Sequence, residues 1–326
     1  MKATILVGDV LTRIKEIPDQ TVQTCITSPP YWGLRDYGHD GQLGLEPSPE
    51  AYVESMVEVF REVRRVLRDD GTLWLNLGDS YHGSWGNYSG QNRGHGSQRE
   101  IVTGSLTQQK SYDGLEEWRP PSSYRIEGLK PKDLVGIPWR VAFALQQDGW
   151  WLRQDIIWHK PNPMPESVTD RCTKAHEYMF LLTKSARYYF DNDPIKEPAN
   201  NAGKIGGSFK GRQGTANYHA QSGGVGSEAK NYENRNKRSV WTINTKPFKG
   251  AHFAVMPEAL CEPPILATSQ PDDLVFDPFT GSGTVATVAL RHGRNYLGIE
   301  LNPDYTQIAH DRITQDQPIL NEVEIR

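Results

Sequence analysis

The sequence predicts an α/β protein built on a mostly parallel, twisted sheet with helices on both faces. Strand-like and helix-like segments alternate at both ends of the chain, which is the pattern of such folds. Two turns rich in glycine or proline follow predicted strands, where ligands bind in open α/β sheets. Two long polar tracts interrupt the apolar segments, and they are expected to be insertions outside the core.

Composition sets broad limits on this protein. A chain of 326 residues allows one large domain with insertions. No apolar run approaches the roughly 18 to 20 residues of a membrane span, so the expected location is the cytoplasm. Cys25, Cys172 and Cys261 lie far apart, which favours buried apolar residues over metal ligands, and no metal is expected. The net charge of -4 means that any nucleic-acid surface must be local.

The first third of the chain begins with a strand, a turn and a helix. Residues 4–7 are β-rich, and apolar residues recur at helical spacing over 10–14 before Pro18. A second strand over 22–26 runs into Thr27-Ser28-Pro29-Pro30-Tyr31-Trp32. Two prolines cannot continue a strand, so this hexapeptide is expected to form a rigid loop at the end of the strand.

The remaining elements follow from the same reasoning. Helices are expected over 49–67, 139–147, from 257 and over 284–291, and strands over 72–77, 151–158, 274–277 and 295–300. Residues 177–183 and 188–190 resemble a closing hairpin. The stretch 82–121 has few aliphatic residues, and is expected to be a mobile surface loop.

A glycine-rich turn between a strand and a helix forms the first candidate site. Gly281 and Gly283 allow a sharp turn and a close approach of the backbone to a ligand, and the helix that follows offers free N–H groups. No lysine follows the glycines, which excludes a P-loop. Glu300 ends the next strand, where an acidic residue accepts hydrogen bonds from ribose hydroxyls. The pattern favours a nucleoside site over a structural turn with an incidental glutamate.

The hexapeptide is the second candidate site, and its residue types suit one kind of chemistry. An exocyclic amino group of a base is a poor nucleophile because its lone pair is delocalised into the ring. Acceptors that bind its two protons localise that lone pair, and Ser28 Oγ and the Pro29 carbonyl are suitable. Tyr31 offers a flat face for an extruded base, and positioning then drives an in-line transfer from a sulfonium. A proline-stiffened turn packed on aromatic residues is the structural alternative.

Together the two motifs resemble the beta class of amino-group DNA methyltransferases. In that circularly permuted class the catalytic motif precedes the cofactor motif, as Ser28-Pro29-Pro30-Tyr31 here precedes Asp277–Thr284. The resemblance implies a Rossmann-like fold and S-adenosylmethionine as cofactor. The residues that it assigns to the cofactor are Asp9, Asp277, Pro278, Phe279, Thr280, Gly281, Ser282, Gly283, Thr284 and Glu300. His252–Pro257 is similar to the segment that encloses the methionine part, with Met256 where phenylalanine is usual.

The same resemblance implies the reaction. Serine before Pro-Pro-Tyr is associated with the 4-amino group of cytosine and aspartate with the 6-amino group of adenine, so Ser28 favours cytosine. We expect a site-specific methyltransferase that flips the base out of double-stranded DNA and belongs to a restriction-modification system or acts as an orphan or phage methylase. A restriction endonuclease would then act separately. Methylation of adenine or of RNA, and a non-catalytic nucleoside-binding module, are the alternatives.

The DNA contacts are expected in two places. The segment around Trp158, Lys160 and Asn162 is similar to the family's strand beside the target pocket, and Trp32 is expected near the same base. Residues 191–250 form the expected target-recognition region, inserted into a catalytic domain of 1–190 and 251–326. Its basic excess includes Arg235, Lys237 and Arg238, which suit phosphate and base-edge contacts. A solvated loop with charges of both signs is the alternative for this tract.

Overall fold

The computed structural model describes residues 1–34, 39, 41–82, 128–199, 233–245, 255–316 and 322–326. Among them, six α-helices are α1 (Val10–Arg13), α2 (Pro49–Val66), α3 (Ile137–Gln147), α4 (Glu258–Thr268), α5 (Thr284–Arg291) and α6 (Pro303–Asp316). Two 3-10 turns are η1 (Ile14–Glu16) and η3 (Asp193–Ile195). The expected loop over 82–121 lies almost entirely outside the described residues.

The strands of the main sheet come from both ends of the chain. They are β1 (Lys2–Val7), β2 (Val22–Thr27), β3 (Leu67–Leu77), β4 (Trp151–His159), β5 (His176–Thr183), β8 (Val240–Thr242), β9 (Leu274–Asp277), β10 (Asn295–Glu300) and β11 (Glu322–Ile325). Their order is β11-β1-β10-β9-β2-β3-β5-β4-β8. A small separate ladder pairs β6 (Glu197–Pro198) with β7 (Asn234–Arg235).

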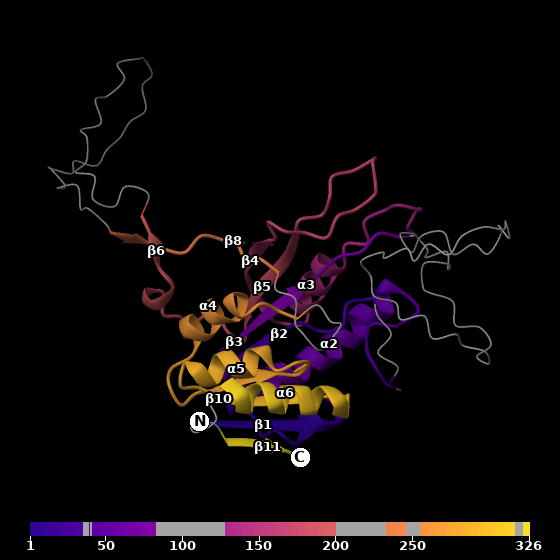
Figure 1. Ribbon diagram of the computed structural model, residues 1–326. Coiled ribbons are helices and arrows are strands. Elements are labelled where there is room, and N and C mark those ends of the chain that lie inside the picture. Colours follow the sequence, from indigo (N-terminus) through magenta and orange to yellow (C-terminus); the bar gives the residue numbers. More distant parts are fainter. Residues whose placement is uncertain (35–38, 40, 83–127, 200–232, 246–254, 317–321) are drawn as a thin grey trace, which may run out of the picture.

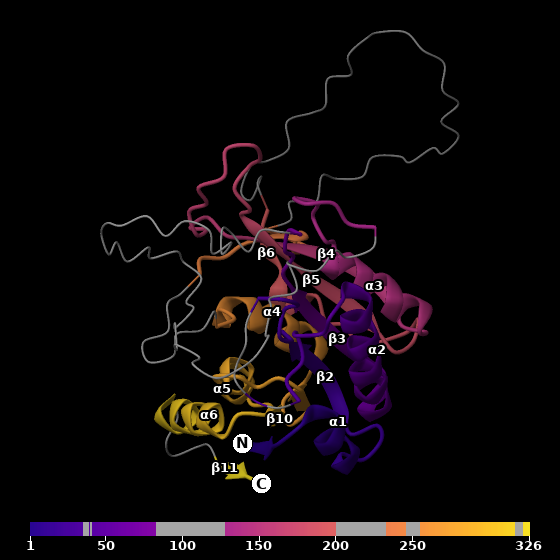
Figure 2. The same cartoon turned by 90° about the vertical axis from the view of Figure 1, so that its right-hand side faces the viewer.

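Helices cover both faces of this sheet, as Figure 2 shows, with α1, α2 and α3 on one side and α4, α5 and α6 on the other. Each face has its own apolar core: Tyr52, Met56 and Phe60 of α2 pack in one, and Ile265 of α4 and Val285 of α5 pack in the other. The predicted α/β class with a mostly parallel sheet between helices is therefore confirmed.

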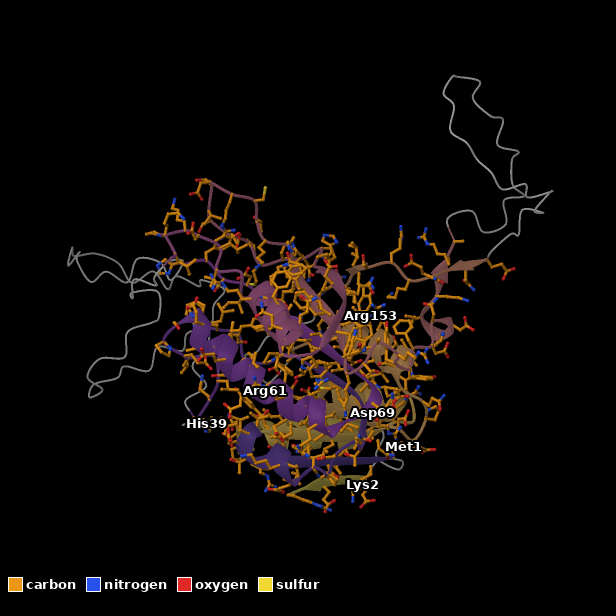
Figure 3. The ribbon with its side chains drawn as sticks, turned by 180° about the vertical axis from the view of Figure 1, so that it is seen from behind. Met1, Lys2, His39, Arg61, Asp69 and Arg153 are labelled. Carbon is orange, nitrogen blue, oxygen red and sulfur yellow. The ribbon has the colours of Figure 1, made fainter. Side chains whose placement is uncertain are left out.

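The longest helix on the first face is α2, and its sequence explains its limits. The Ser48 side chain accepts a hydrogen bond from the Ala51 N–H, and Pro49 occupies the first turn, where its missing N–H costs nothing. Its apolar side is buried on the sheet, whereas Arg61 points to solvent in the view from behind (Figure 3) and pairs with Asp148. The helix follows the predicted periodicity, but β3 begins at Leu67, five residues earlier than predicted.

One expectation about the middle of the chain needs correction. β5 does not form a hairpin with residues 188–190, because it lies between β3 and β4 and pairs antiparallel with both. Residues 188–190 are not in a strand. The end of the 191–250 tract also contributes to the main sheet, since β8 pairs in parallel with β4. The described part of that tract is thus joined to the catalytic body.

The strand directions bring many loops to one edge of the sheet. β1, β10, β9, β2 and β3 run parallel, so their carboxyl ends meet there. β5 is antiparallel to β3 and β4 is antiparallel to β5, so the start of β5 and the end of β4 lie at the same edge. Figure 1 shows β1 and β10 in the lower part of the molecule with β2 and β3 above them, and β9 lies between β10 and β2 in the strand order. This edge is where a ligand site is expected.

Within the residues that the structure describes, no helix has both the length and the apolar character needed to cross a membrane. Cys25 and Cys261 are buried as expected, but Cys172 is exposed.

Candidate functional site

A pocket of about 410 Å³ opens at the carboxyl edge of the sheet. Its walls come from the ends of β1, β2, β9, β10 and β4, the start of β5, and residues of β3 and α6. Its size is in the range of small-molecule sites, roughly 300 to 1,000 Å³. Both sequence motifs therefore open into one pocket.

The two motifs touch directly at adjacent strand ends. β2 and β9 pair in parallel, with Cys25 opposite Phe276. The Thr27 hydroxyl donates a hydrogen bond of 2.6 Å to Asp277 Oδ1, which also accepts from the Phe279 N–H at 3.0 Å. The hexapeptide loop and the glycine-rich turn are thus joined by a buried bond between residues 250 positions apart.

The glycine-rich turn has the conformation that the sequence predicts. Gly281 and Gly283 have φ of +51° and +75°, in the left-handed region that favours glycine. A Cβ at Gly283 would also lie 3.0 Å from the Ala309 Cβ on α6. Of the ten residues assigned to the cofactor, the pocket is lined by Asp9, Asp277, Pro278, Phe279, Thr280, Gly281, Ser282, Thr284 and Glu300. Gly283 does not line the pocket and is the N-cap residue of α5.

Two buried carboxylates face this part of the pocket. Glu300 accepts hydrogen bonds from the N–H groups of Gly281 at 2.8 Å and Asn302 at 2.9 Å. Burial raises the pKa of Glu300 to about 7, and burial likewise raises the pKa of Asp277 to about 7. A ligand that carries positive charge and hydroxyl donors would compensate for their desolvation. The donor set therefore fits S-adenosylmethionine, which has both.

Asp9 follows β1 and serves a structural purpose as well as lining the pocket. Its Oδ1 accepts from the Thr12 N–H at 3.0 Å and the Thr12 hydroxyl at 2.9 Å, so it caps α1. Capping by aspartate stabilises a helix by about 1 kcal/mol. The contact with the cofactor that the resemblance assigns to Asp9 stays a prediction.

The loop after β2 is held from outside by α2 and by the chain near Glu46. The Tyr52 hydroxyl donates to the Pro30 carbonyl at 2.9 Å. Trp32 is 5% exposed, packs in the core and donates from Nε1 to the Glu46 carbonyl at 2.9 Å. Ser28, Pro29, Pro30 and Tyr31 line the pocket, but Trp32 does not. Trp32 therefore anchors the loop in the core, and its contact with the target base stays a prediction.

Tyr31 is fixed by its hydroxyl and by its ring. The hydroxyl lies 2.8 Å from Glu177 Oε2, 3.1 Å from Asn76 Oδ1 and 3.3 Å from Ser28 Oγ. Its ring packs on Gly78, where a Cβ would lie 2.5 Å from Tyr31 Cε2. Burial raises the pKa of the Tyr31 phenol well above its ordinary value, and the Glu177 carboxylate raises it further. The phenol therefore stays protonated.

The wall opposite the catalytic loop comes from β4 and β5. Trp158 and Lys160 line the pocket, and the Lys160 ammonium lies 4.2 Å from the centre of the Trp158 ring and binds Glu177. Asn162 is not part of the lining. Its side-chain amide bonds the backbone of Thr245 in both directions, at 3.2 Å and 3.0 Å, and Thr245 lines the pocket. Asn162 therefore supports the wall from behind.

Within the described part of the 191–250 tract, the basic residues Arg235, Lys237 and Arg238 do not line the pocket. Arg235 and Arg238 both bind the Glu197 carboxylate, at 3.0 Å and 2.7 Å, and Lys237 lies 5.1 Å from the centre of the Trp241 ring. Trp241 is buried and packs against Trp74, so it belongs to the core. Residues 200–232, including Tyr218 and Tyr232, are outside the described residues. The DNA contacts of this tract stay a prediction.

The sequence interpretation missed Asn76 and Glu177, and it gave no role to Thr27 within the hexapeptide. Asn76 is 2% exposed and donates to the Tyr178 carbonyl and Glu177 Oε2. The sequence did offer one signal for Asn76 and Glu177, because each is a polar residue in an otherwise apolar strand segment. These segments are Leu73–Leu77 and Glu177–Thr183. A buried polar group needs partners, and here Asn76 and Glu177 are partners of each other, whereas Thr27 bonds Asp277.

Comparison with known proteins identifies a family and several relatives. The family model described as DNA methylase, of the N6/N4 methyltransferases, matches residues 22–311. The Type II methyltransferase M.Cfr9I of Citrobacter freundii is 45% identical over 95% of this chain and 87% of its own length. The Type II methyltransferase M.SmaI of Serratia marcescens is 43% identical over 95% of this chain and 90% of its own length.

Solved structures share the fold at lower sequence identity. The PvuII DNA methyltransferase, described as cytosine-N4-specific, is 17% identical, with a TM-score of 0.60 over 99% of this chain and 95% of its own. The putative DNA modification methylase TTHA0409 of Thermus thermophilus, complexed with S-adenosylmethionine, is 21% identical, with a TM-score of 0.58 over 99% of this chain and 97% of its own. The expected Rossmann-like methyltransferase fold is confirmed.

Proposed function

Since this chain belongs to the N6/N4 family of DNA methylases, we propose that it transfers a methyl group from S-adenosylmethionine to the N4 amino group of cytosine in double-stranded DNA. S-adenosylmethionine is the cofactor of these enzymes. The observation that carries the proposal is the bond from Thr27 to Asp277, which holds Ser28 and the cofactor turn in one pocket. Ser28, not aspartate, precedes the Pro-Pro-Tyr sequence, and the PvuII enzyme with this fold is cytosine-N4-specific by its description.

The residues of the catalytic loop supply acceptors for the amino group. The Pro30 carbonyl already accepts from Tyr52, which leaves the Pro29 carbonyl and Ser28 Oγ to bind the two amino protons and localise the nitrogen lone pair. S-adenosylmethionine, when bound, supplies an electrophilic methyl group on a sulfonium. The protein positions and orients the two reactants, and this lowers the activation free energy substantially when a reaction needs only in-line approach.

The target cytosine must leave the duplex to enter the pocket, at a cost of a few kcal/mol. Tyr31 and Trp158 line the same pocket as Ser28, and stacking of the base on aromatic side chains would offset part of that cost. In this proposal residues 191–250 contact the duplex and Arg235, Lys237 and Arg238 meet phosphates. The relatives named as Type II methyltransferases suggest that a separate restriction endonuclease acts on the same sequence.

The product identifies the base. We expect the protein, incubated with labelled S-adenosylmethionine and duplex DNA, to give 4-methylcytosine after digestion to nucleosides. A second candidate product, 6-methyladenine, fits the same acceptor geometry, because both bases present an exocyclic amino group. Its appearance would overturn the choice of cytosine, and a lack of label in every DNA tested would overturn the enzymatic function.

Cofactor affinity should depend on pH near neutrality. Glu300 and Asp277 have pKa values raised to about 7, so both carry protons in the free protein below that pH. A cationic ligand with hydroxyl donors binds best when they are ionised, so affinity should rise as pH increases from 5.5 to 7.5 and then level off. Calorimetry in buffers of different ionisation enthalpy should detect proton release at pH 6.5.

The stability of the free protein should show the opposite trend. Because these two carboxyls hold protons in the folded state that unfolded carboxyls lose near pH 4, the free energy of unfolding should fall between pH 4 and 7 from this source. Glu300→Gln should weaken this dependence, whereas Glu54→Gln, which alters an exposed carboxylate on α2, should not. An affinity that is flat from pH 5.5 to 7.5 would contradict the assignment of these carboxylates to the cofactor.

A further inference from the structure

Ser28 is the first member of a short series of hydrogen bonds that ends at a carboxylate. Ser28 Oγ donates to the Tyr31 hydroxyl at 3.3 Å, and the Tyr31 hydroxyl lies 2.8 Å from Glu177 Oε2. The three residues come from the catalytic loop and from the start of β5, which the antiparallel direction of β5 brings to this edge. All three line the pocket.

The direction of these hydrogen bonds follows from the groups around them. Tyr31 has one hydroxyl proton and two acceptors within reach, Glu177 at 2.8 Å and Asn76 Oδ1 at 3.1 Å. The nearer acceptor is a carboxylate, and charge-assisted hydrogen bonds are the stronger kind. The Tyr31 proton therefore points to Glu177, and the phenol oxygen is left to accept the proton of Ser28.

Glu177 is held in place by its own partners. Its Oε1 binds the Lys160 ammonium, and the Asn76 amide donates to Oε2 at 3.3 Å. The side chains of Lys160 and Glu177 are only 18% and 16% exposed. The series of hydrogen bonds therefore ends at a carboxylate that is paired with an ammonium and held in place by an amide.

We propose that Glu177 is a positioning residue that acts through Tyr31 to make Ser28 a stronger acceptor for the amino group of the target base. The inference rests on the proposed function. Because the Ser28 proton is engaged by Tyr31, both lone pairs of Ser28 Oγ remain available to the base. The charge of the Glu177 carboxylate, transmitted through the Tyr31 hydroxyl, thereby makes the neutral Ser28 hydroxyl a stronger hydrogen-bond acceptor.

The same series can take the proton that the reaction releases. When the nitrogen lone pair forms the N–CH₃ bond, the S–CH₃ bond breaks and its electron pair stays on sulfur, which leaves a methylated ammonium. That ammonium loses one proton to Ser28 Oγ while the Ser28 proton passes to Tyr31 and the Tyr31 proton passes to Glu177. Serine and tyrosine end neutral as they began, and Glu177 ends as a carboxylic acid.

This arrangement gives a physical reason for serine where an aspartate would seem the better acceptor. An aspartate at position 28 would place its charge near the Glu177 carboxylate, and like charges in a partly buried site disfavour each other. In this chain the charge is placed on β5, paired with Lys160, and its effect is transmitted by two hydroxyl groups.

The test is a double-mutant cycle on single-turnover rates with saturating cofactor and DNA. Glu177→Gln keeps the size of the side chain but removes its charge, and Tyr31→Phe removes the connection. We expect each to lower the rate about 30-fold or more. The double variant should be within about 3-fold of the slower single variant, because residues in one series do not act additively. The Kd for S-adenosylmethionine should change less than about 3-fold.

Glu166→Gln is the matched control. Glu166 is also a partly buried carboxylate, paired with Arg171 at 2.6 Å, but it lies outside the pocket lining, so its rate should match that of the parent. The action of Glu177 on Ser28 through Tyr31, called the relay, would be contradicted by two results. One is a double variant whose loss of rate is the product of the two single losses. The other is a Glu177→Gln rate within 3-fold of the parent. A Glu177→Gln loss explained by weaker cofactor binding or a lower melting temperature would also contradict it, because it would indicate a structural role.

The product of the unmodified protein separates this inference from the function on which it rests. If the parent yields 4-methylcytosine and Glu177→Gln is as fast, the relay is wrong and the proposed function stands. If the parent yields no 4-methylcytosine, the proposed function fails, and the relay to a cytosine amino group fails with it.

Discussion

Replacing Ser28 with alanine should lower the single-turnover rate of methyl transfer by roughly 10²- to 10³-fold, the usual effect of losing one group that stabilises a transition state. The hydroxyl is the side-chain acceptor that the catalytic loop turns into the pocket. Without it one amino proton of the base is unbound, and the nitrogen lone pair stays delocalised. The expected loss is in the rate at saturating substrate, since the interaction matters most in the transition state.

The cofactor provides the control measurement for this variant. Ser28 makes no contact with the glycine-rich turn among the hydrogen bonds found in the described residues, so the Kd for S-adenosylmethionine should stay within about twofold. Ser55→Ala, which removes a hydroxyl bonded to the Ala51 carbonyl on α2, should leave both rate and Kd unchanged. Equal losses of cofactor affinity and rate in Ser28→Ala would argue against the role of Ser28 as acceptor.

Replacing Glu300 with alanine should raise the Kd for S-adenosylmethionine on the order of 100-fold, because hydrogen bonds to a charged group are each worth about 1.5 to 3 kcal/mol. The carboxylate is expected to accept the ribose hydroxyls. It also holds the N–H groups of Gly281 and Asn302, so its removal leaves these donors without their acceptor and loosens the turn.

Titration calorimetry measures this effect directly. At saturating cofactor the rate of methyl transfer by Glu300→Ala should approach that of the parent, since Glu300 lies at the end of β10 and Ser28 at the end of β2. Glu54→Ala, on the exposed side of α2, should bind the cofactor as the parent does. An unchanged Kd in Glu300→Ala would refute the placement of the cofactor at this strand end.

The sequence predicted the elements whose periodicity is strong. The apolar repeat of α2, the strand before the glycine-rich turn and α5 after it all lie within a few residues of their expected limits. These segments are buried on one side or entirely, so the spacing of their apolar residues shows which residues face the core. The early start of β3 was missed because Asp70-Gly71 is ordinarily a turn signal, yet here that polar stretch is already part of the strand.

Pairing between distant segments could not be deduced in the same way. The aromatic run Tyr188–Phe190 suits a strand, but both edges of β5 are already taken by β3 and β4. β8 has only three residues, Val240–Thr242, which are too few to show a period. Glu177 entered the site only through the antiparallel direction of β5, and no local pattern in the sequence fixes that direction.

The bond from Thr27 to Asp277 has a consequence for how the protein is made. The chain must close a loop of about 250 residues before β2 can pair with β9, and such long-range closure slows folding because its entropy is lost before the contacts form. In a nascent chain, Thr27 at the start of the Ser-Pro-Pro-Tyr loop lacks its partner Asp277 until residue 277 has left the ribosome. Methylating capacity should therefore appear abruptly and late in synthesis.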